Sequence, residues 1–273
     1  MKRYALFLGC TTPVKVPQYE LASRWVCNRL GIELVDIEEF GCCGSNQRNL
    51  SVGTALIMAA MNLALAEERG LEVLTLCAAC TGSLAEAAET LRDDSARERV
   101  NEKLKDVGLA YRGTTVVKHL SRVLYEDVGV ERIMSEAKEP LAGVRVAPHY
   151  GCHYLRPRSA FAGFDEPDNP RTLHRLIAAT GAEPVDYRTA GLCCGGKVSP
   201  VSADLSRQLV RKKIEDLAGE AVRAMVLQCQ TCYLMYNGQM PVLLYPQLLG
   251  LALGARPAED LGMEDGASAF LRA

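Results

Sequence analysis

The cysteines of this chain fall into two matching sets, and this internal repeat constrains the fold more than any other feature. Each set has a single cysteine, then an adjacent pair, then a Cys-x-x-Cys. The gaps are 31 and 33 residues in the first half, and 40 and 34 residues in the second. The first set is Cys10, Cys42, Cys43, Cys77 and Cys80, and the second set is Cys152, Cys193, Cys194, Cys229 and Cys232. A repeat on this scale predicts two copies of one structural unit.

Short apolar runs alternate with helical patterns in both halves. We expect strands at residues 3–9, 32–37, 72–76 and 114–120, and again at residues 144–149, 183–187, 224–228 and 241–245. Alternating strands and helices predict parallel α/β layers. The stretch 138–143 (KEPLAG) breaks the pattern. We therefore predict an α/β fold of two half-domains, residues 1–138 and 139–273, each a small parallel sheet flanked by helices.

The helical patterns lie between the expected strands. The clearest are residues 18–30, 52–69, 173–180 and 203–217, while residues 248–253 are either helical or a loop. A helix over residues 84–91 is expected to have Thr81 or Ser83 as its cap. A charged helical stretch at residues 95–107 has no counterpart in the second half. In both halves the cysteines fall at or just beyond the carboxyl ends of expected strands, where parallel sheets place their ligand sites.

Composition excludes several classes of protein. The chain has 31 basic and 33 acidic residues, so it lacks the basic excess of a general nucleic-acid or membrane-surface binder. No stretch approaches the roughly 18 apolar residues of a membrane span. The apolar run before Cys10 is too short for a secretory signal. We therefore expect a cytoplasmic protein without a membrane span, in which repeated cysteines are metal ligands or redox groups more often than disulfides.

The number of cysteines favours iron–sulfur clusters over the alternatives. Structural zinc takes four ligands, whereas each set offers five, and adjacent cysteines point apart too readily to share one small ion. Thioredoxin-like chemistry uses only the Cys-x-x-Cys of each set and leaves six cysteines of the sets unexplained. Thiolate-rich sites without histidine suit iron–sulfur clusters. A simple four-iron cube uses four cysteines, so five in each set suggest a less symmetric cluster. The eleventh cysteine, Cys27, is expected to be a buried small hydrophobic residue.

The residues that flank the cysteines suit an anionic group. Gly41, Gly44, Gly195 and Gly196 lie beside the two pairs and allow backbone amides to approach sulfur closely. Ordinary turn formation explains these glycines equally well. The Cys77-x-x-Cys80 segment is expected to open a helix, whose N-terminus stabilises thiolate charge.

The chain resembles the cysteine-rich CCG-domain proteins, and specifically the B subunit of heterodisulfide reductase. The resemblance covers nearly the whole chain. The paired five-cysteine pattern is typical of CCG domains, and the flanking stretches narrow it to the branch of the B subunit. These stretches are residues 4–10 (YALFLGC), 40–44 (FGCCG), 117–120 (VKHL), 149–153 (HYGCH) and 241–250 (PVLLYPQLLG).

The resemblance implies a structure, a cofactor and partners. It implies two half-domains related by a pseudo-two-fold axis, with a non-cubane [4Fe-4S] cluster held by the five cysteines of each set. It also implies that the two clusters face each other across a site where a small disulfide is split, with electrons arriving one at a time. The chain has neither a ferredoxin-like run of cysteines nor a flavin-binding glycine fingerprint. We therefore expect two partners, a ferredoxin-like iron–sulfur subunit of the C type and a flavoprotein subunit of the A type.

Three other polar residues are candidates for catalysis. His153 and Tyr154 directly follow Cys152, where a proton donor for a leaving thiolate would sit. Alternatively, the histidines beside Cys152 only hydrogen-bond groups around the cluster. Lys197 follows the second cysteine pair, and the resemblance supplies no role for it.

Two other functions compete with a catalytic disulfide reductase subunit. One is an electron-transfer CCG subunit that passes electrons to a quinone or another partner without disulfide chemistry. The other is a scaffold subunit stabilised by zinc. The two complete cysteine sets favour the disulfide reductase, because two facing clusters can take both sulfurs of a disulfide.

Overall fold

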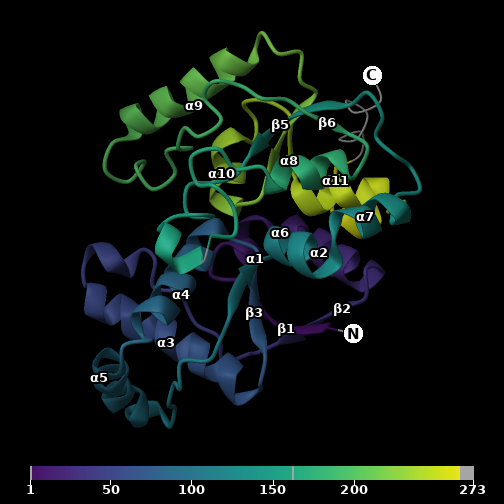
Figure 1. Ribbon diagram of the computed structural model, residues 1–273. Coiled ribbons are helices and arrows are strands. Elements are labelled where there is room, and N and C mark those ends of the chain that lie inside the picture. The colour runs from purple at the N-terminus through teal and green to yellow at the C-terminus, as the bar shows by residue number, and fades with distance from the viewer. Residues whose placement is uncertain (1, 162, 265–273) are drawn as a thin grey trace.

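Two four-stranded parallel sheets, one from each half of the chain, form the centre of the molecule. The computed structural model describes residues 2–161 and 163–264. The first sheet has the order β2-β1-β3-β4 and the second has the order β6-β5-β7-β8, so the two halves repeat one topology (Figure 1). The strands are β1 (Lys2–Phe7), β2 (Ile32–Asp36), β3 (Glu72–Thr75), β4 (Val117–His119), β5 (Arg145–His149), β6 (Glu183–Pro184), β7 (Ala224–Leu227) and β8 (Val242–Leu244). The predicted fold class is confirmed, and all eight expected strands are present.

The central strands of each sheet are buried because helices cover both faces, as all-parallel sheets require. All four residues of β7 are buried, as are the last four of β1. The helices of the first half are α1 (Thr12–Lys15), α2 (Pro17–Arg29), α3 (Val52–Glu68), α4 (Ala78–Thr90), α5 (Asp94–Leu104), α6 (Leu120–Val123) and α7 (Val130–Glu136). Those of the second half are α8 (Thr172–Ala178), α9 (Ala203–Leu217), α10 (Gln230–Tyr236), α11 (Tyr245–Ala252) and α12 (Pro257–Leu261). The 3-10 helices are η1 (Gln47–Asn49), η2 (Lys105–Val107) and η4 (Arg158–Phe161), and η3 (Leu124–Val128) is a π-helix.

The start of α4 corrects one expectation. Neither Thr81 nor Ser83 caps this helix, because it begins at Ala78 with Cys77 as its N-cap. The sulfur of Cys77 accepts a hydrogen bond from the Cys80 amide at 3.4 Å, and this bond satisfies one of the unpaired amides of the first turn. The expectation that the Cys-x-x-Cys opens a helix is confirmed.

The two halves share one hydrophobic core. Buried apolar side chains from both sheets form a single cluster of residues in contact. Helix α11 of the second half packs against α2 of the first half. The amides of Lys138 and Glu139 both donate to the carbonyl of Ala252. The boundary between residues 138 and 139 stays a prediction.

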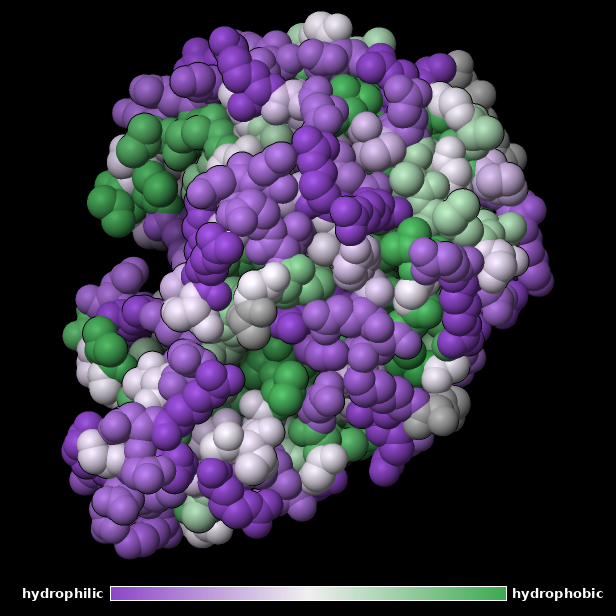
Figure 2. Space-filling model, viewed as in Figure 1, coloured by the Kyte–Doolittle hydropathy of each residue, from purple (hydrophilic) through white to green (hydrophobic). Residues whose placement is uncertain are grey.

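The surface is mostly polar on the face shown in Figure 2. It is hollowed at the left edge, between the region of α9 and that of α3 and α4, and apolar residues gather on both sides of the hollow. No helix in residues 2–161 and 163–264 is both long and apolar enough to cross a membrane.

Candidate functional site

The loops that follow the strands bring each set of cysteines together. Cys10 follows β1 and Cys77 follows β3, while Cys152 and Cys229 occupy the same places after β5 and β7. The pairs lie in the loops that follow β2 and β6. Because all strands in a sheet are parallel, these loops meet at one edge of their sheet.

Within each set the thiols contact one another in the same order. In the first set, Cys10 contacts Cys42, the members of the pair contact each other, Cys43 contacts Cys80, and Cys80 contacts Cys77. In the second set, Cys152 contacts Cys193, the members of the pair contact each other, Cys194 contacts Cys232, and Cys232 contacts Cys229. The Cys194–Cys232 sulfur distance is 3.3 Å. The repeat in sequence is thus a repeat in space.

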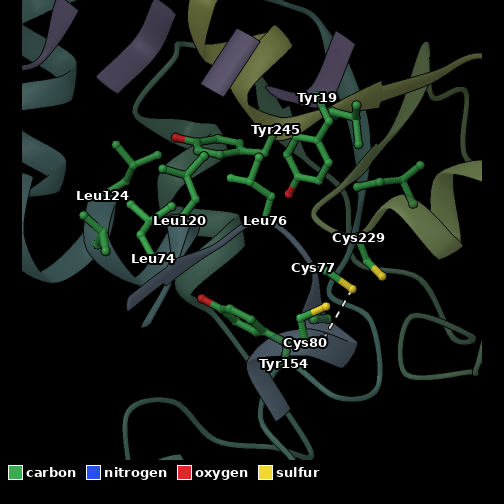
Figure 3. Close-up of a cluster of buried hydrophobic side chains, with 14 of the residues drawn as sticks. Tyr19, Leu74, Leu76, Cys77, Cys80, Leu120, Leu124, Tyr154, Cys229 and Tyr245 are labelled. Atoms are coloured by element: carbon green, nitrogen blue, oxygen red, sulfur yellow. Dashed lines mark hydrogen bonds between the residues drawn. The ribbon is translucent and has the colours of Figure 1, made fainter. Parts of the chain in front are cut away.

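The two sets meet at Cys77 and Cys229, whose side chains contact each other (Figure 3). Cys77 is the N-cap of α4 and Cys229 is the N-cap of α10, so the same position of each half faces its counterpart. Contact with Cys229 raises the pKa of the Cys77 thiol well above its usual value. Contacts with Cys232 and Cys77 lower the pKa of the Cys229 thiol.

Each set runs from the surface to this buried meeting point. Cys10 and Cys152 are exposed, Cys42 and Cys193 are half-buried, and the other cysteines of the sets are buried. In the part of the chain that the structure describes, no three His, Cys, Asp or Glu side chains surround one point as the ligands of a single metal ion would. Instead, the thiols form a row. Five sulfur donors without histidine fit a polynuclear iron–sulfur cluster, which is wider than one ion.

Two glycines hold the cysteine pairs against the helices that follow them. Gly44 and Gly195 both have φ of +78°, a conformation that favours glycine. A Cβ atom on Gly44 would lie 2.7 Å from the carbonyl oxygen of Ala55, and one on Gly195 would lie 2.9 Å from Oγ of Ser206. The pairs therefore sit in turns that only glycine allows, directly on α3 and α9.

A buried polar residue follows each pair at the same offset, and sequence reasoning missed both. Asn62 in α3 and Lys213 in α9 each lie 20 residues after the first cysteine of their pair, and both are fully buried. Asn62 Oδ1 accepts from the Gly41 amide at 2.8 Å, and Asn62 Nδ2 donates to the Cys42 carbonyl at 3.2 Å. Comparing the two halves position by position would have singled out these residues.

The three candidate catalytic residues lie in different surroundings. His153 is half-buried where the halves meet, and its carbonyl oxygen would lie 3.1 Å from a Cβ on Gly82 of α4. Burial lowers the pKa of its imidazole, so the ring is neutral at pH 7. Lys197 is exposed, and its ammonium donates a hydrogen bond to Ser45 beside the first pair. Tyr154 is buried, and its hydroxyl points away from the labelled cysteines (Figure 3). Its geometry favours packing, and its role as a proton donor stays a prediction.

A cavity of about 240 Å³ opens beside Cys152. Its lining includes Arg156, His174 and the buried His149. Neither ring nitrogen of His149 has a hydrogen-bond partner among the described residues. The cavity therefore offers polar groups next to the exposed cysteine of the second set.

Comparison with known proteins matches both halves to one family. The family described as "Cysteine-rich domain" (CCG) matches residues 4–85 and 146–237. The B subunit of ferredoxin:CoB-CoM heterodisulfide reductase from Methanosarcina mazei is 35% identical over 98% of this chain and 94% of its own length. A protein of Archaeoglobus profundus, named as similar to the B subunit of heterodisulfide reductase, is 33% identical over 96% of this chain and 94% of its own length.

Two further similarities concern a quinol-linked protein and a solved structure. The 8-methylmenaquinol:fumarate reductase membrane anchor subunit of Wolinella succinogenes is 32% identical over 96% of this chain and 95% of its own length. The crystal structure of a hypothetical protein from Helicobacter pylori has a TM-score of 0.75 with 17% identity. That structure covers 96% of this chain, which spans about half (51%) of the other protein. It supports the fold alone.

Proposed function

Because the chain belongs to the cysteine-rich CCG family, in the branch of the heterodisulfide reductase B subunit, we propose that it is the catalytic subunit of an enzyme complex that splits or forms a disulfide. Its relatives support an iron–sulfur subunit of a larger oxidoreductase. We further propose that each five-cysteine set holds one non-cubane [4Fe-4S] cluster. In this proposal a ferredoxin-like protein and a flavoprotein of the same complex deliver electrons, and the complex is cytoplasmic.

The contact between Cys77 and Cys229 is the observation that carries this proposal. A disulfide has two sulfur atoms, and cleaving it requires two electrons. Two cysteine sets that meet at one point can hold two redox groups close enough to act on both sulfurs. When bound, such clusters would supply electrons one at a time, and their iron atoms could bind the two sulfur atoms of the cleaved disulfide.

The chain's own residues provide the surroundings for this chemistry. The buried cysteines around Cys77 and Cys229 exclude water from the side where the sets meet. The exposed Cys10 and Cys152 leave the other end of each set open to a solute. In this proposal the neutral imidazole of His153, which directly follows Cys152, relays a proton to a departing thiolate. The ammonium of Lys197, between the two pairs, attracts a negatively charged substrate.

Electron transfer without disulfide chemistry is the second candidate function. One observation favours it: a relative of nearly equal identity is named as the membrane anchor subunit of a menaquinol:fumarate reductase. In this case the two sets would pass electrons onward to a quinone or another partner, and no disulfide would bind.

A single-turnover assay tests the proposal. The chemically reduced protein is mixed with one equivalent of a disulfide, and the released thiol is measured for the wild type, Cys77→Ala and Cys229→Ala. We expect both variants to lose cleavage, because each disturbs one of the two groups. Cys27→Ala is the matched control, since Cys27 is buried outside the sets and should not affect cleavage. If a variant shown to lack one cluster still cleaved the disulfide at the wild-type rate, electron transfer would be the better assignment.

A further inference from the structure

The two halves place different charges behind their cysteine pairs. At the equivalent position of the long helix that follows the pair, α3 carries the neutral Asn62 and α9 carries Lys213. Both side chains are fully buried. At this position the two halves, which repeat the cysteines and the glycine turns, therefore differ by one buried positive charge.

Asn62 has only a structural role in the first half. Its side chain bonds the Gly41 amide, the Cys42 carbonyl and the Met58 carbonyl at 2.8 to 3.2 Å. These bonds hold the turn of the first pair against α3. The amide adds no net charge near the first set.

Lys213 binds the segment just before the second pair with an ammonium group. Its Nζ donates to the carbonyl of Thr189 and, at 2.9 Å, to that of Ala190, in the segment that leads into the second pair. It also lies 5.1 Å from the centre of the Tyr187 ring. Carbonyl oxygens and an aromatic face both favour the protonated amine. Burial lowers the pKa of Lys213 to about 8, which leaves the ammonium form dominant at neutral pH.

The charge of Lys213 is not neutralised by a neighbouring acid. Within the described residues, no carboxylate lies within 4.0 Å of its Nζ. The nearby Asp216 instead pairs with Arg188 and accepts a hydrogen bond from the Thr189 amide. The positive charge of Lys213 interacts with the cysteines of the second set, including Cys194 and Cys232, and favours their thiolate forms.

The first set has a cation of its own, but that cation is exposed. Lys197 reaches the first pair, where its charge helps to lower the pKa of Cys43 to about 6, after contact with Cys80. Solvent screens the charge of the exposed Lys197 more than that of the buried Lys213. At equal distance the buried ammonium therefore acts more strongly.

Other buried equivalent positions also differ in polarity, and they do so in both directions: Thr75 and His119 of the first half stand where the second half has Leu227 and Leu244. His149 of β5 stands where β1 has Phe7, three residues before the single cysteine of its set. Gln228 stands where the first half has Leu76, directly before the Cys-x-x-Cys. Both polar residues are buried. These neutral residues carry no net charge, so the buried ammonium of Lys213 is the main electrostatic difference between the surroundings of the two sets.

We infer that the buried ammonium of Lys213 gives an iron–sulfur group on the second cysteine set the higher reduction potential, so that an electron passes from the first set to the second. For each electron transferred, the group on the first set is oxidised by one electron and the group on the second is reduced by one. This inference rests on the proposed function, because it requires a redox group on each set. Lys213 acts through space as a positioning residue and does not touch the substrate.

An anaerobic redox titration followed by electron paramagnetic resonance tests this inference. We expect two midpoint potentials in the wild type. In Lys213→Gln, which keeps a hydrogen-bond donor without the charge, the higher midpoint should fall by at least the 59 mV that corresponds to a tenfold change in a one-electron ratio. The lower midpoint should stay in place. In the reciprocal variant Asn62→Lys, the lower midpoint should rise. Lys212→Gln, which removes an exposed lysine beside Lys213, should change neither.

The assignment of each midpoint has its own check. Cys42→Ser disturbs only the first set, so the midpoint that it retains should be the higher one. The inference is wrong if Cys42→Ser retains the lower midpoint potential. It is also wrong if Lys213→Gln shifts neither midpoint potential, or shifts both by the same amount. Should Lys213→Gln bind less iron, Lys213→Met provides a second neutral variant of similar length. Iron and sulfide are measured first: their absence in the wild type overturns the proposed function, whereas two loaded sets without the shift overturn only the role of Lys213.

Discussion

Lys197 of the second half donates a hydrogen bond to Ser45 of the first, and this bond links the turns of the two cysteine pairs. The ammonium is exposed and lies near both Cys43 and His153, whose pKa values its charge lowers. A single cation thus stands where the two candidate sites adjoin.

If Lys197 attracts the substrate, its removal should depend on substrate charge. We expect Lys197→Met to raise KM severalfold for a disulfide that carries carboxylates and to change KM little for a neutral disulfide, because an exposed charge contributes about 1 kcal/mol or less. Steady-state kinetics with both disulfides measures this difference, with Lys212→Met as the control. Equal changes for both disulfides would indicate that Lys197 only ties the two turns together.

Elemental analysis tests the proposed cofactors. Protein prepared without oxygen should contain about eight irons and about eight acid-labile sulfides per chain, as two four-iron sites require. Removal of iron with a chelator should abolish the visible absorbance and the redox activity together. One or two zinc ions without sulfide would contradict the cluster assignment and favour a zinc scaffold.

The order of thiol contacts predicts which substitutions act locally. Cys42 and Cys193 lie toward the outer ends of the row, away from the point where the sets meet. We expect Cys42→Ser and Cys193→Ser each to lose about half of the iron and sulfide, and the double variant to lose nearly all. If one single variant emptied both halves, the two sites would not be independent.

The glycine turns predict a matched pair of stability effects. Gly44→Ala and Gly195→Ala should each destabilise the protein by about 1–3 kcal/mol, because each forces a side chain into a positive-φ position that a helix already fills. Each should also lower the iron content of its own half. Gly53→Ala is the control, since a Cβ there meets no atom within 4 Å. Thermal melting and iron analysis measure both effects, and an unchanged melting temperature in all three variants would contradict the close approach.

Lys213 predicts an unusual dependence of stability on pH. The pKa of this side chain is about 8 in the folded protein and about 10.5 when exposed, so between these values the unfolded chain binds more protons. Stability relative to Lys213→Met should therefore rise with pH across this window, by up to about 3 kcal/mol. The neighbouring His149, Tyr187 and Asp216 do not titrate in this window, because the pKa values of His149 and Asp216 lie far below it and that of Tyr187 lies above it. Melting temperatures at pH 7.5, 9 and 10 provide the measurement, and a constant difference would mean that Lys213 does not titrate there.

The strands and their order of appearance were predictable because each is a short apolar run that ends at a turn. The start of α4 was not, because a thiol is seldom considered as a helix cap. Thr81, the expected cap, uses its hydroxyl to donate to the Cys77 carbonyl instead, and Ser83 donates to the Cys43 carbonyl. Both hydroxyls serve the cysteine loops rather than the helix.

The membership of each cysteine set was also readable from spacing, but the contacts between the sets were not. The meeting of Cys77 with Cys229 and the bond from Lys197 to Ser45 join residues 152 positions apart. Such pairs depend on how the two sheets pack, which neither propensity nor periodicity specifies. The exchange of Asn62 for Lys213 was visible in the sequence, yet its significance depends on both side chains being buried.

The shared core has a consequence for how a substrate reaches the protein. Domains that open and close on a ligand are usually joined by a small, polar interface. Here the apolar interior is continuous across both sheets, and α11 of one half packs on α2 of the other. Bending at the junction between the halves would expose these buried apolar side chains to water. The two halves should therefore behave as one rigid body. The spacing between the two redox sites is set on folding, and a bound molecule has to adapt its own shape to that spacing.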